Sequence, residues 1–244
     1  MFPYFELFGR SISAYTMLGV AALAVATAVA ALRAKRHNLL AEDLILAALF
    51  AGGGLVAGGM LLFAIVQLAQ GMHPFGGMVF YGGLFGTLAA LCLYAKMMRK
   101  NLGAVIALAV PVFPLAHGIM RLGCFAAGCC FGRPHDTMGI AFTNAVGAPN
   151  GIPLLPVQLY EAALNLAIFA ALWLFSRKKR RATSLLGIYG LTYGVGRFVL
   201  EFLRGDTHRG FVLGMSTSQF ISVLVVVACV VMLLVRNRKA AVLV

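Results

Sequence analysis

Residues 117–133 bring glycine, arginine and cysteine together in a chain that is otherwise mostly apolar. Arg121 directly follows an apolar stretch, where a charged side chain is costly unless it has a partner or an anionic ligand. Glycine allows close backbone approach and a positive φ, which an anion-binding loop uses. The glycines of this segment are Gly118, Gly123, Gly128 and Gly132. Two interpretations are open: an anion-binding loop, or a tight turn between two membrane helices whose arginine reaches the interface.

A second group of charges lies near residue 200. Arg197 and Glu201 are four positions apart and Arg204 is three further, so the three share one face of a helix. The residues between them are mainly phenylalanine, valine and leucine. A charged line on an apolar helix is expected to face the interior of a bundle or a water-filled cavity. The line is either a structural ion pair or part of a binding site.

The segment 156–161 supplies a carboxylate at membrane depth. Pro156 suits the first turn of a helix, and Glu161 follows without a basic neighbour in the sequence. Gln158 and Glu161 are three positions apart and share a face, with Tyr160 between them. An ionisable residue within the membrane is a functional-site hypothesis by default, and we expect its partner to be an arginine of another segment. The alternative is an ion pair that only holds two helices together.

Three of the five cysteines lie close together in the sequence, at Cys124, Cys129 and Cys130. Cys92 and Cys229 lie within apolar stretches and are expected to act as small core residues. The spacing of the three matches no standard zinc pattern, whereas neighbouring arginines would lower a thiol pKa and favour a nucleophile. We expect a disulfide or simple packing before a nucleophile, and a metal site last.

Two polar positions at helix starts are further candidates. Tyr81 opens an apolar stretch, as an interfacial anchor or as a polar group facing a cavity. Ser216 begins a polar first turn that reads as a helix cap, and Gln219 in that turn is expected to project into the same cavity.

The composition predicts an all-α integral membrane protein. Of the 244 residues, 61% are hydrophobic and 11% are charged, against about 25% charged in a soluble domain. Continuous apolar stretches of spanning length predict helices and not a barrel. There are about seven, near 13–32, 44–69, 78–98, 103–120, 157–175, 184–203 and 217–235. We expect one membrane domain over 1–244, no cleaved signal peptide, and an external loop of little regular structure at about 132–156.

The basic residues orient the predicted helices. Fourteen of the 20 lysines and arginines fall in 33–36, 96–100, 177–181 and 236–239, which predicts that this side is cytoplasmic and that the N-terminus lies outside. The net charge of +13 is therefore assigned to topology and anionic lipid, not to nucleic acid. The other six are all arginine, whose planar fork suits phosphate: Arg10, Arg121, Arg133, Arg197, Arg204 and Arg209. They predict an anion site at the outer leaflet.

Together these segments resemble the prolipoprotein diacylglyceryl transferase family. Met120–Gly128 is similar to that family's Gly-Arg-x-Gly-Asn-Phe-x-Asn-Gly signature, and 156–161 is similar to its Pro-Ser-Gln-Leu-Tyr-Glu segment. The segment 193–204 is similar to its Tyr-Gly…Arg…Glu-Phe-x-Arg segment. Ser216–Gln219 and Tyr15 also match positions of the family, in the family's order.

The resemblance implies a seven-span enzyme of the bacterial cytoplasmic membrane, with its site toward the outer leaflet and no cofactor. The implied reaction moves diacylglycerol from phosphatidylglycerol to a cysteine thiol of a lipobox-containing preprotein and releases glycerol phosphate. Arg121 and Arg197 would bind the phosphate, and Glu201 would orient Arg197. The predicted substrate-binding set is Tyr15, Arg121, Gly123, Gln158, Tyr160, Glu161, Arg204 and Gln219. The predicted catalytic set is Arg197 and Glu201, together with Tyr81, which stands where the family has a histidine.

The chain departs from the family where the acceptor would be handled. The family's His-Gly-Gly in the third span is Tyr81-Gly82-Gly83 here, and the signature's asparagines are Cys124 and Ala127. Candidate bases are Tyr81, Glu161 and the cysteines of 124–130. The departures leave open a paralogous transferase with the same donor and another acceptor, and a lipid-binding or transport protein without turnover.

Overall fold

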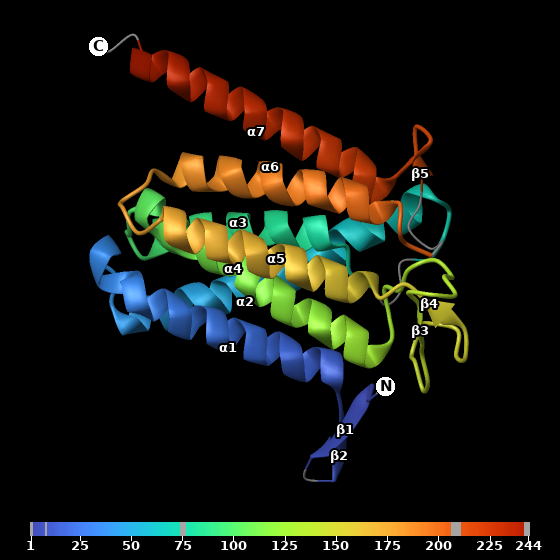
Figure 1. Cartoon of the computed structure of the whole chain (residues 1–244). Coiled ribbons are helices and arrows are strands. Elements are labelled where there is room, and N and C mark those ends of the chain that lie inside the picture. Colours follow the sequence, from blue (N-terminus) through green and yellow to red (C-terminus); the bar gives the residue numbers. More distant parts are fainter. Residues whose placement is uncertain (1, 8, 74–76, 206–210, 242–244) are drawn as a thin grey trace.

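The computed structural model describes residues 2–7, 9–73, 77–205 and 211–241, and its main elements are seven α-helices (Figure 1). Their bounds are α1 Ala14–Ala34, α2 Ala41–Ala69, α3 Phe80–Met97, α4 Leu102–Ala127, α5 Val157–Phe175, α6 Ala182–Glu201 and α7 Thr217–Ala241. A 3-10 turn, η1, covers Lys35–His37. The expected all-α architecture is confirmed, with each predicted stretch corresponding to one helix.

Short antiparallel strand pairs lie outside the helices. They are β1 Tyr4–Leu7 with β2 Arg10–Ser13, β3 Ile140–Ala141 with β4 Pro153–Leu154, and β5 Phe211–Val212 with β6 Met215–Ser216. The predicted loop at about 132–156 is irregular apart from the β3–β4 pair. It encloses a small apolar cluster of Phe142, Ala148 and Leu154.

Six of the described helices are long and apolar enough to cross a membrane. The seventh, α6, has a spanning length of 20 residues but carries Arg197 and Glu201, together with buried Ser184, Tyr189 and Tyr193. It packs between α5 and α7. Its polar groups therefore turn toward protein, which is where a membrane helix tolerates them.

Helices α2 and α3 meet through glycine. Gly54 and Gly58 of α2 face Gly82 and Gly86 of α3, and a Cβ on any of the four would collide with the backbone of the opposite helix. Without a hydrophobic drive between helices in lipid, small residues that allow close backbone approach are the usual basis of helix association.

Helix α4 runs seven residues further than the predicted 103–120, to Ala127, and this corrects the expectation of a glycine loop around Arg121. Gly118 and Gly123 are helical and let α4 approach Leu166 of α5 and Leu18 of α1 closely. Among the four glycines of 117–133, the one with positive φ is Gly128, at +69°, which ends the helix as its C-cap. Arg121 therefore projects from a packed helix and not from a flexible loop.

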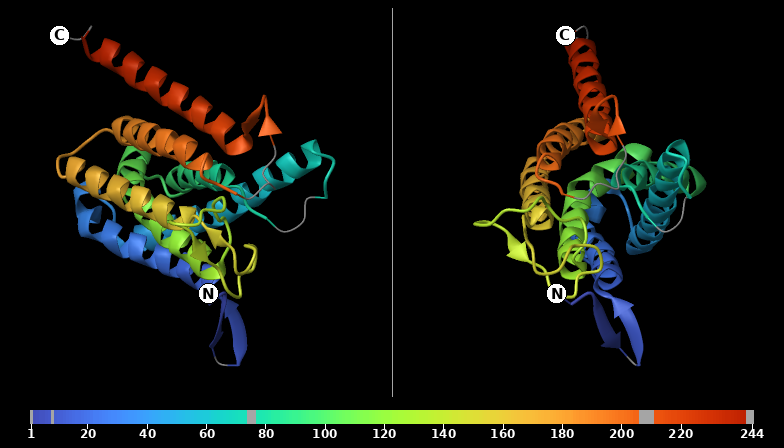
Figure 2. Two further views of the ribbon diagram at one scale, coloured as in Figure 1. Left: turned by 45° about the vertical axis from the view of Figure 1, so that its right-hand side comes forward. Right: turned by 90° about the vertical axis from the view of Figure 1, so that its right-hand side faces the viewer.

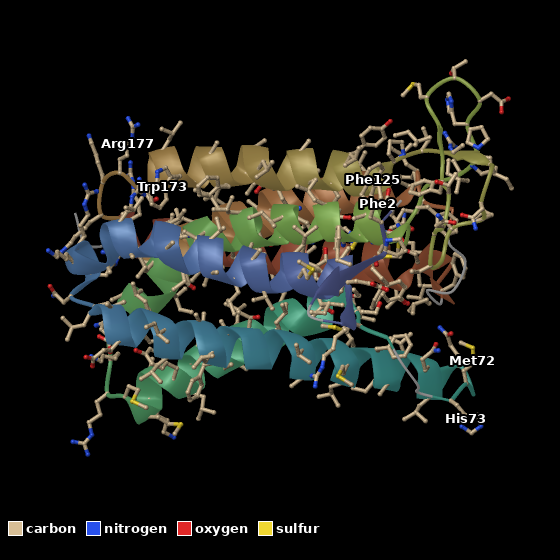
Figure 3. All side chains as sticks on the ribbon, turned by 90° about the horizontal axis from the view of Figure 1, so that it is seen from below. Phe2, Met72, His73, Phe125, Trp173 and Arg177 are labelled. Carbon is tan, nitrogen blue, oxygen red and sulfur yellow. The ribbon has the colours of Figure 1, made fainter. Side chains whose placement is uncertain are left out.

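The antiparallel helices give the bundle two chemically different ends (Figure 2). The loops rich in lysine and arginine, around 33–36, 96–100 and 177–181, lie at one end, which we call the basic end. Figure 3 shows Trp173 and Arg177 there, far from Phe2 and Phe125 at the other end. The second half of α4, the first turns of α5 and the last turns of α6 meet at that other end, where the charged side chains predicted to do chemistry come together.

Candidate functional site

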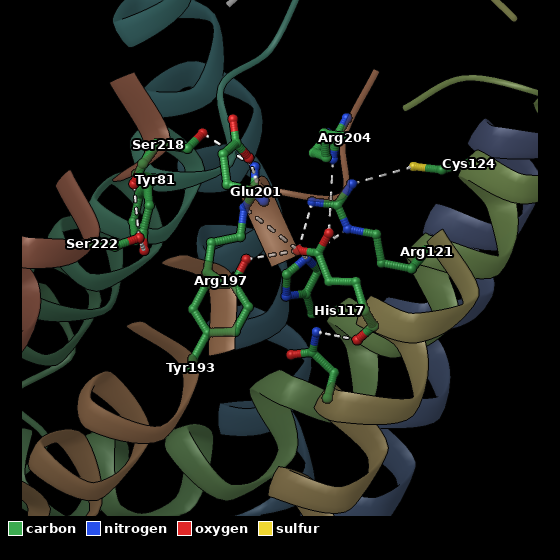
Figure 4. A network of polar contacts seen from close by, with 12 residues as sticks. Tyr81, His117, Arg121, Cys124, Tyr193, Arg197, Glu201, Arg204, Ser218 and Ser222 are labelled. Atoms are coloured by element: carbon green, nitrogen blue, oxygen red, sulfur yellow. Dashed lines mark hydrogen bonds and ion pairs between the residues drawn. The ribbon is translucent and has the colours of Figure 1, made fainter. Parts of the chain in front are cut away.

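A single carboxylate, that of Glu161 on α5, lies at the centre of the site and is fully buried. Its Oε1 accepts a hydrogen bond from the Tyr193 hydroxyl at 2.9 Å and lies 2.9 Å from Nη2 of Arg121 (Figure 4). Arg197 and Arg204 each place a guanidinium nitrogen 3.9 Å from one of its oxygens. Three arginines from α4, α6 and the segment after α6 thus surround one glutamate.

Arg197 is held by a second carboxylate as well. Its Nη1 lies 2.6 Å from Oε2 of Glu201, one helical turn further along α6, and its Nη2 donates to Ser218 Oγ of α7 at 3.2 Å. The expected pairing of Arg197 with Glu201 is therefore present in the structure. Because both residues are buried, the guanidinium has a fixed direction toward Glu161.

His117 also belongs to this cluster, although the sequence analysis did not select it. Its ring stacks on Phe80 at 3.9 Å between centroids, and its Nε2 accepts a hydrogen bond from Arg121 Nε at 3.2 Å. A ring nitrogen that accepts carries no proton, so the imidazole is neutral. The signal for it was available, because His117 and Arg121 are four positions apart within an apolar helix.

We call Arg121, Arg197, Arg204, Glu161, Glu201, His117 and Tyr193 the buried charge network. Among these described residues, three arginines face two glutamates, which leaves one positive charge in excess. Oε2 of Glu161 is buried and has no hydrogen-bond partner. Burying charges is costly unless they are paired, so an excess cation in this setting favours a bound monoanion.

Other predicted binding residues frame the network. Gln158, on the first turn of α5, donates from Nε2 to the backbone carbonyl of Cys129 at 2.7 Å and ties α5 to the segment after α4. A Cβ on Gly123 would lie 3.3 Å from Cα of Tyr15, so this glycine brings α1 against α4 beside Arg121. Tyr15 is half-buried at this contact. Tyr160 is also half-buried, about 100° around α5 from Glu161.

Tyr81 lies beside the buried charge network, but its hydroxyl contacts Ser222, which is outside the network. The ring is buried 6.2 Å from that of Tyr193, and its oxygen lies 2.5 Å from Ser222 Oγ of α7. Gln219 closes the first turn of α7, because its Oε1 accepts from the backbone N–H of Ser216 at 3.1 Å. Direct substrate contact by Tyr81 and Gln219 stays a prediction.

The six arginines expected at this side separate into two groups. Arg121, Arg197 and Arg204 converge in the network, whereas Arg10 on β2 and Arg133 after α4 are exposed. Arg209 lies outside the described residues. Burial and a shared carboxylate thus distinguish the three arginines that form a site.

The three predicted cysteines are brought together as free thiols beside Arg121. Arg121 Nη1 lies 3.9 Å from Sγ of Cys124. Of the two alternatives expected for these cysteines, a disulfide or simple packing, the structure has the thiols free and packed together.

An apolar cavity of about 470 Å³ adjoins the network between α1, α2, α3 and α4. Tyr15, Met120 and Tyr189 line it near the charged residues. Val20 and Val56 also line it and are 67% and 49% exposed on the outer surface of the bundle. No residue of the buried charge network is among its described lining residues, but Ala116 and Met120, the chain neighbours of His117 and Arg121, are, so the cavity runs along the adjacent side of α4.

Comparison with known proteins gives one consistent result. The family model described as prolipoprotein diacylglyceryl transferase matches residues 3–235. A Clostridium tetani protein named phosphatidylglycerol–prolipoprotein diacylglyceryl transferase is 36% identical over 232 residues, which cover 91% of this chain and 92% of that protein. A Clostridium perfringens protein of the same name, numbered 2, is 30% identical over 96% of this chain and 94% of its own length.

Proposed function

Because the chain belongs to the prolipoprotein diacylglyceryl transferase family, we propose that it transfers diacylglycerol from phosphatidylglycerol to the cysteine thiol of a lipobox-containing preprotein. The observation that carries this proposal is the single excess positive charge of the buried charge network beside an apolar cavity. Phosphatidylglycerol has matching parts, since its phosphodiester is a monoanion and its acyl chains are apolar.

The buried charge network and the apolar cavity would bind different parts of the donor lipid. The phosphate would contact Arg121 and Arg197, whose guanidinium groups suit bidentate phosphate binding. The acyl chains would occupy the cavity between α1, α2, α3 and α4. Glu161 and Glu201 keep the arginines in position when no lipid is bound, because each carboxylate is paired with Arg197 or Arg121.

The reaction breaks the bond between the glyceryl carbon and the phosphate oxygen. The acceptor sulfur attacks that carbon, and the bonding electron pair passes to the departing glycerol phosphate. Arginines aimed at that oxygen stabilise the growing charge, an effect of roughly 3 kcal/mol for each well-placed donor. Removing the proton of the acceptor thiol requires a further group, because Glu161 is surrounded by cations and His117 already accepts from Arg121.

Membrane location and orientation are part of the proposal. Six helices suited to a membrane and the basic end support a multi-pass protein of the bacterial cytoplasmic membrane, with the basic end in the cytoplasm and the network toward the outer leaflet. Preproteins carry their lipobox at that leaflet, which would give the acceptor thiol access.

The test uses the purified protein with labelled phosphatidylglycerol and a lipobox peptide. We expect glycerol phosphate release together with a peptide mass increased by one diacylglyceryl group, and loss of both in Arg197→Ala. A paralogous transferase would release glycerol phosphate without modifying the peptide, an outcome that the change from histidine to Tyr81 makes worth measuring. Lipid binding without turnover would overturn the enzymatic proposal.

A further inference from the structure

Three cysteine thiols converge next to the buried charge network. The sulfur atoms of Cys124, Cys129 and Cys130 all lie within 4.8 Å of one another. Cys124 is in the last turn of α4 and is 5% exposed, whereas Cys129 and Cys130 are half-buried. The cluster therefore has a closed side within the bundle and a more open side away from it.

The backbone after α4 turns sharply to produce this convergence. Gly128 adopts a φ of +69°, and the N–H of Cys129 then donates to the carbonyl of Cys124 at 3.0 Å. Cys130 has a φ of +60°, which is unfavourable for a residue with a side chain. Gln158 fixes the turn from α5 through the carbonyl of Cys129. The strained turn brings both later thiols back toward the first.

The spacing of the sulfurs suits a thiophilic metal ion. Zinc binds thiolate sulfur at about 2.3 Å, so sulfurs around a tetrahedral zinc lie about 3.8 Å apart, which the three sulfurs, all within 4.8 Å of one another, can reach with small shifts. Three thiolates and a divalent cation carry one net negative charge. Arg121 has its Nη1 3.9 Å from Cys124 Sγ and its Nη2 2.9 Å from Glu161, so this guanidinium lies between the thiol cluster and the network.

We propose that Cys124, Cys129 and Cys130 bind a thiophilic cation of the Zn²⁺ type, and that its fourth coordination position takes the thiol of the acceptor protein. Three protein ligands with one open position are the pattern of catalytic zinc sites. The second half of this inference rests on the proposed transferase function. It identifies the group that activates the acceptor, which the buried charge network does not supply.

The chemistry is balanced without an oxidant or a reductant. A thiol that coordinates zinc loses its proton, which passes to solvent on the open side of the cluster. The metal-bound thiolate attacks the glyceryl carbon of the donor, and the carbon–oxygen electron pair leaves with glycerol phosphate. Because Arg121 touches both Glu161 and Cys124, an acceptor bound at the metal lies next to a phosphate bound at that arginine.

Metal binding is tested on the purified full-length protein with Co²⁺ as a spectroscopic probe and Zn²⁺ as competitor. We expect thiolate-to-cobalt absorption at one ion per chain, displaced by Zn²⁺ and lost in Cys124→Ser, Cys129→Ser and Cys130→Ser. The matched controls Cys92→Ser and Cys229→Ser, within α3 and α7, should keep it. The absence of a stoichiometric site, or thiol titration that finds two thiols fewer because of a disulfide, would overturn the proposal.

Assays of peptide modification with and without metal then distinguish a failure of the metal site from a failure of the proposed transferase function. Chelated wild-type protein should lose peptide modification by at least tenfold, still bind phosphatidylglycerol, and recover on addition of Zn²⁺. Full transfer by metal-free protein would refute a metal-activated acceptor while leaving the transferase function intact. If the Zn²⁺-loaded protein modifies no peptide, the proposed function fails together with the acceptor role, and the cobalt spectrum still decides whether the metal site exists.

Discussion

The arginines at the two ends of the bundle differ in their partners. At the basic end a cavity of about 370 Å³ is lined by seven lysines and arginines, and no carboxylate is among its described lining residues. Arg33 there stacks over the ring of Trp173 at 3.4 Å and donates to Ser176 Oγ. At the other end Arg121 shares the buried carboxylate of Glu161 with two further arginines.

The two ends differ in how a buried carboxylate is shared: Asp43 at the basic end pairs with Lys100, whereas Glu161 at the other end is shared by three arginines. Exposed lysine and arginine side chains reach water or lipid headgroups and need no acidic partner. Arg33 is buried as well but is satisfied by Ser176 Oγ, the Trp173 carbonyl and the Trp173 ring, whereas the network provides two carboxylates for three cations. The surplus of a single charge is the feature on which the proposed binding of a monoanion rests, whereas the basic end is a broad positive surface.

The largest effect should follow from removing the central carboxylate. Glu161→Gln leaves three buried arginines facing each other with only Glu201 to balance them, which should lower the free energy of unfolding by about 3–5 kcal/mol. The loss of stability is measured as the change in Tm on thermal unfolding in detergent, with Glu42→Gln at an exposed position as the control. An unchanged Tm would mean that the network contributes little to the fold.

Removing an arginine of the network should abolish chemistry with less effect on folding. Arg197→Ala should reduce glycerol phosphate release by about 10²–10³-fold, because a charge-stabilising donor is lost. Arg197→Lys keeps the positive charge but lacks the planar guanidinium, so its rate of glycerol phosphate release should lie between those of the wild type and Arg197→Ala. Both are compared by initial rates at saturating lipid, and an alanine variant with the wild-type rate would exclude Arg197 from phosphate binding.

A smaller effect is expected at Tyr81, next to the network. Tyr81→Phe removes the hydroxyl that contacts Ser222 and should cost about 1 kcal/mol of stability, while transfer stays within about tenfold of wild type. Peptide modification and Tm are measured together, with the exposed Tyr4→Phe for comparison. A loss of transfer comparable to that of Arg197→Ala would assign the base to Tyr81 and weaken the case for the metal.

The smallest effect is expected at the basic end. The double substitution Lys178→Ala and Lys179→Ala should change transfer by no more than about twofold, since exposed positions away from a site contribute within about 0.5 kcal/mol. The same rate assay tests it in vesicles with and without anionic lipid. A large loss would show that the two ends are coupled, contrary to the distinction drawn between them.

The helices and their order were predictable because lipid demands continuous apolar stretches. The end of α4 was not, because Gly118 and Gly123 suggested a loop while serving close contact with α5 and α1. The sequence predicted six arginines on the side opposite the basic loops. Which three of them converge depends on how α4, α5 and α6 pack. His117 was missed although its spacing of four positions from Arg121 on α4 was visible in the sequence, and only its stacking on Phe80 of α3 depends on how the helices pack.

The contact between α2 and α3 also determines how the apolar cavity deforms. Because Gly54 and Gly58 meet Gly82 and Gly86 through bare backbone, that contact has no rotamers to rearrange and is mechanically stiff. The α2–α3 pair therefore forms a rigid wall, as does α1 packed closely on α4 at Gly123. If the cavity holds the acyl chains of the proposed donor, it would widen at the seam between these two pairs, so that lipid exchange would separate two stiff units instead of bending individual helices.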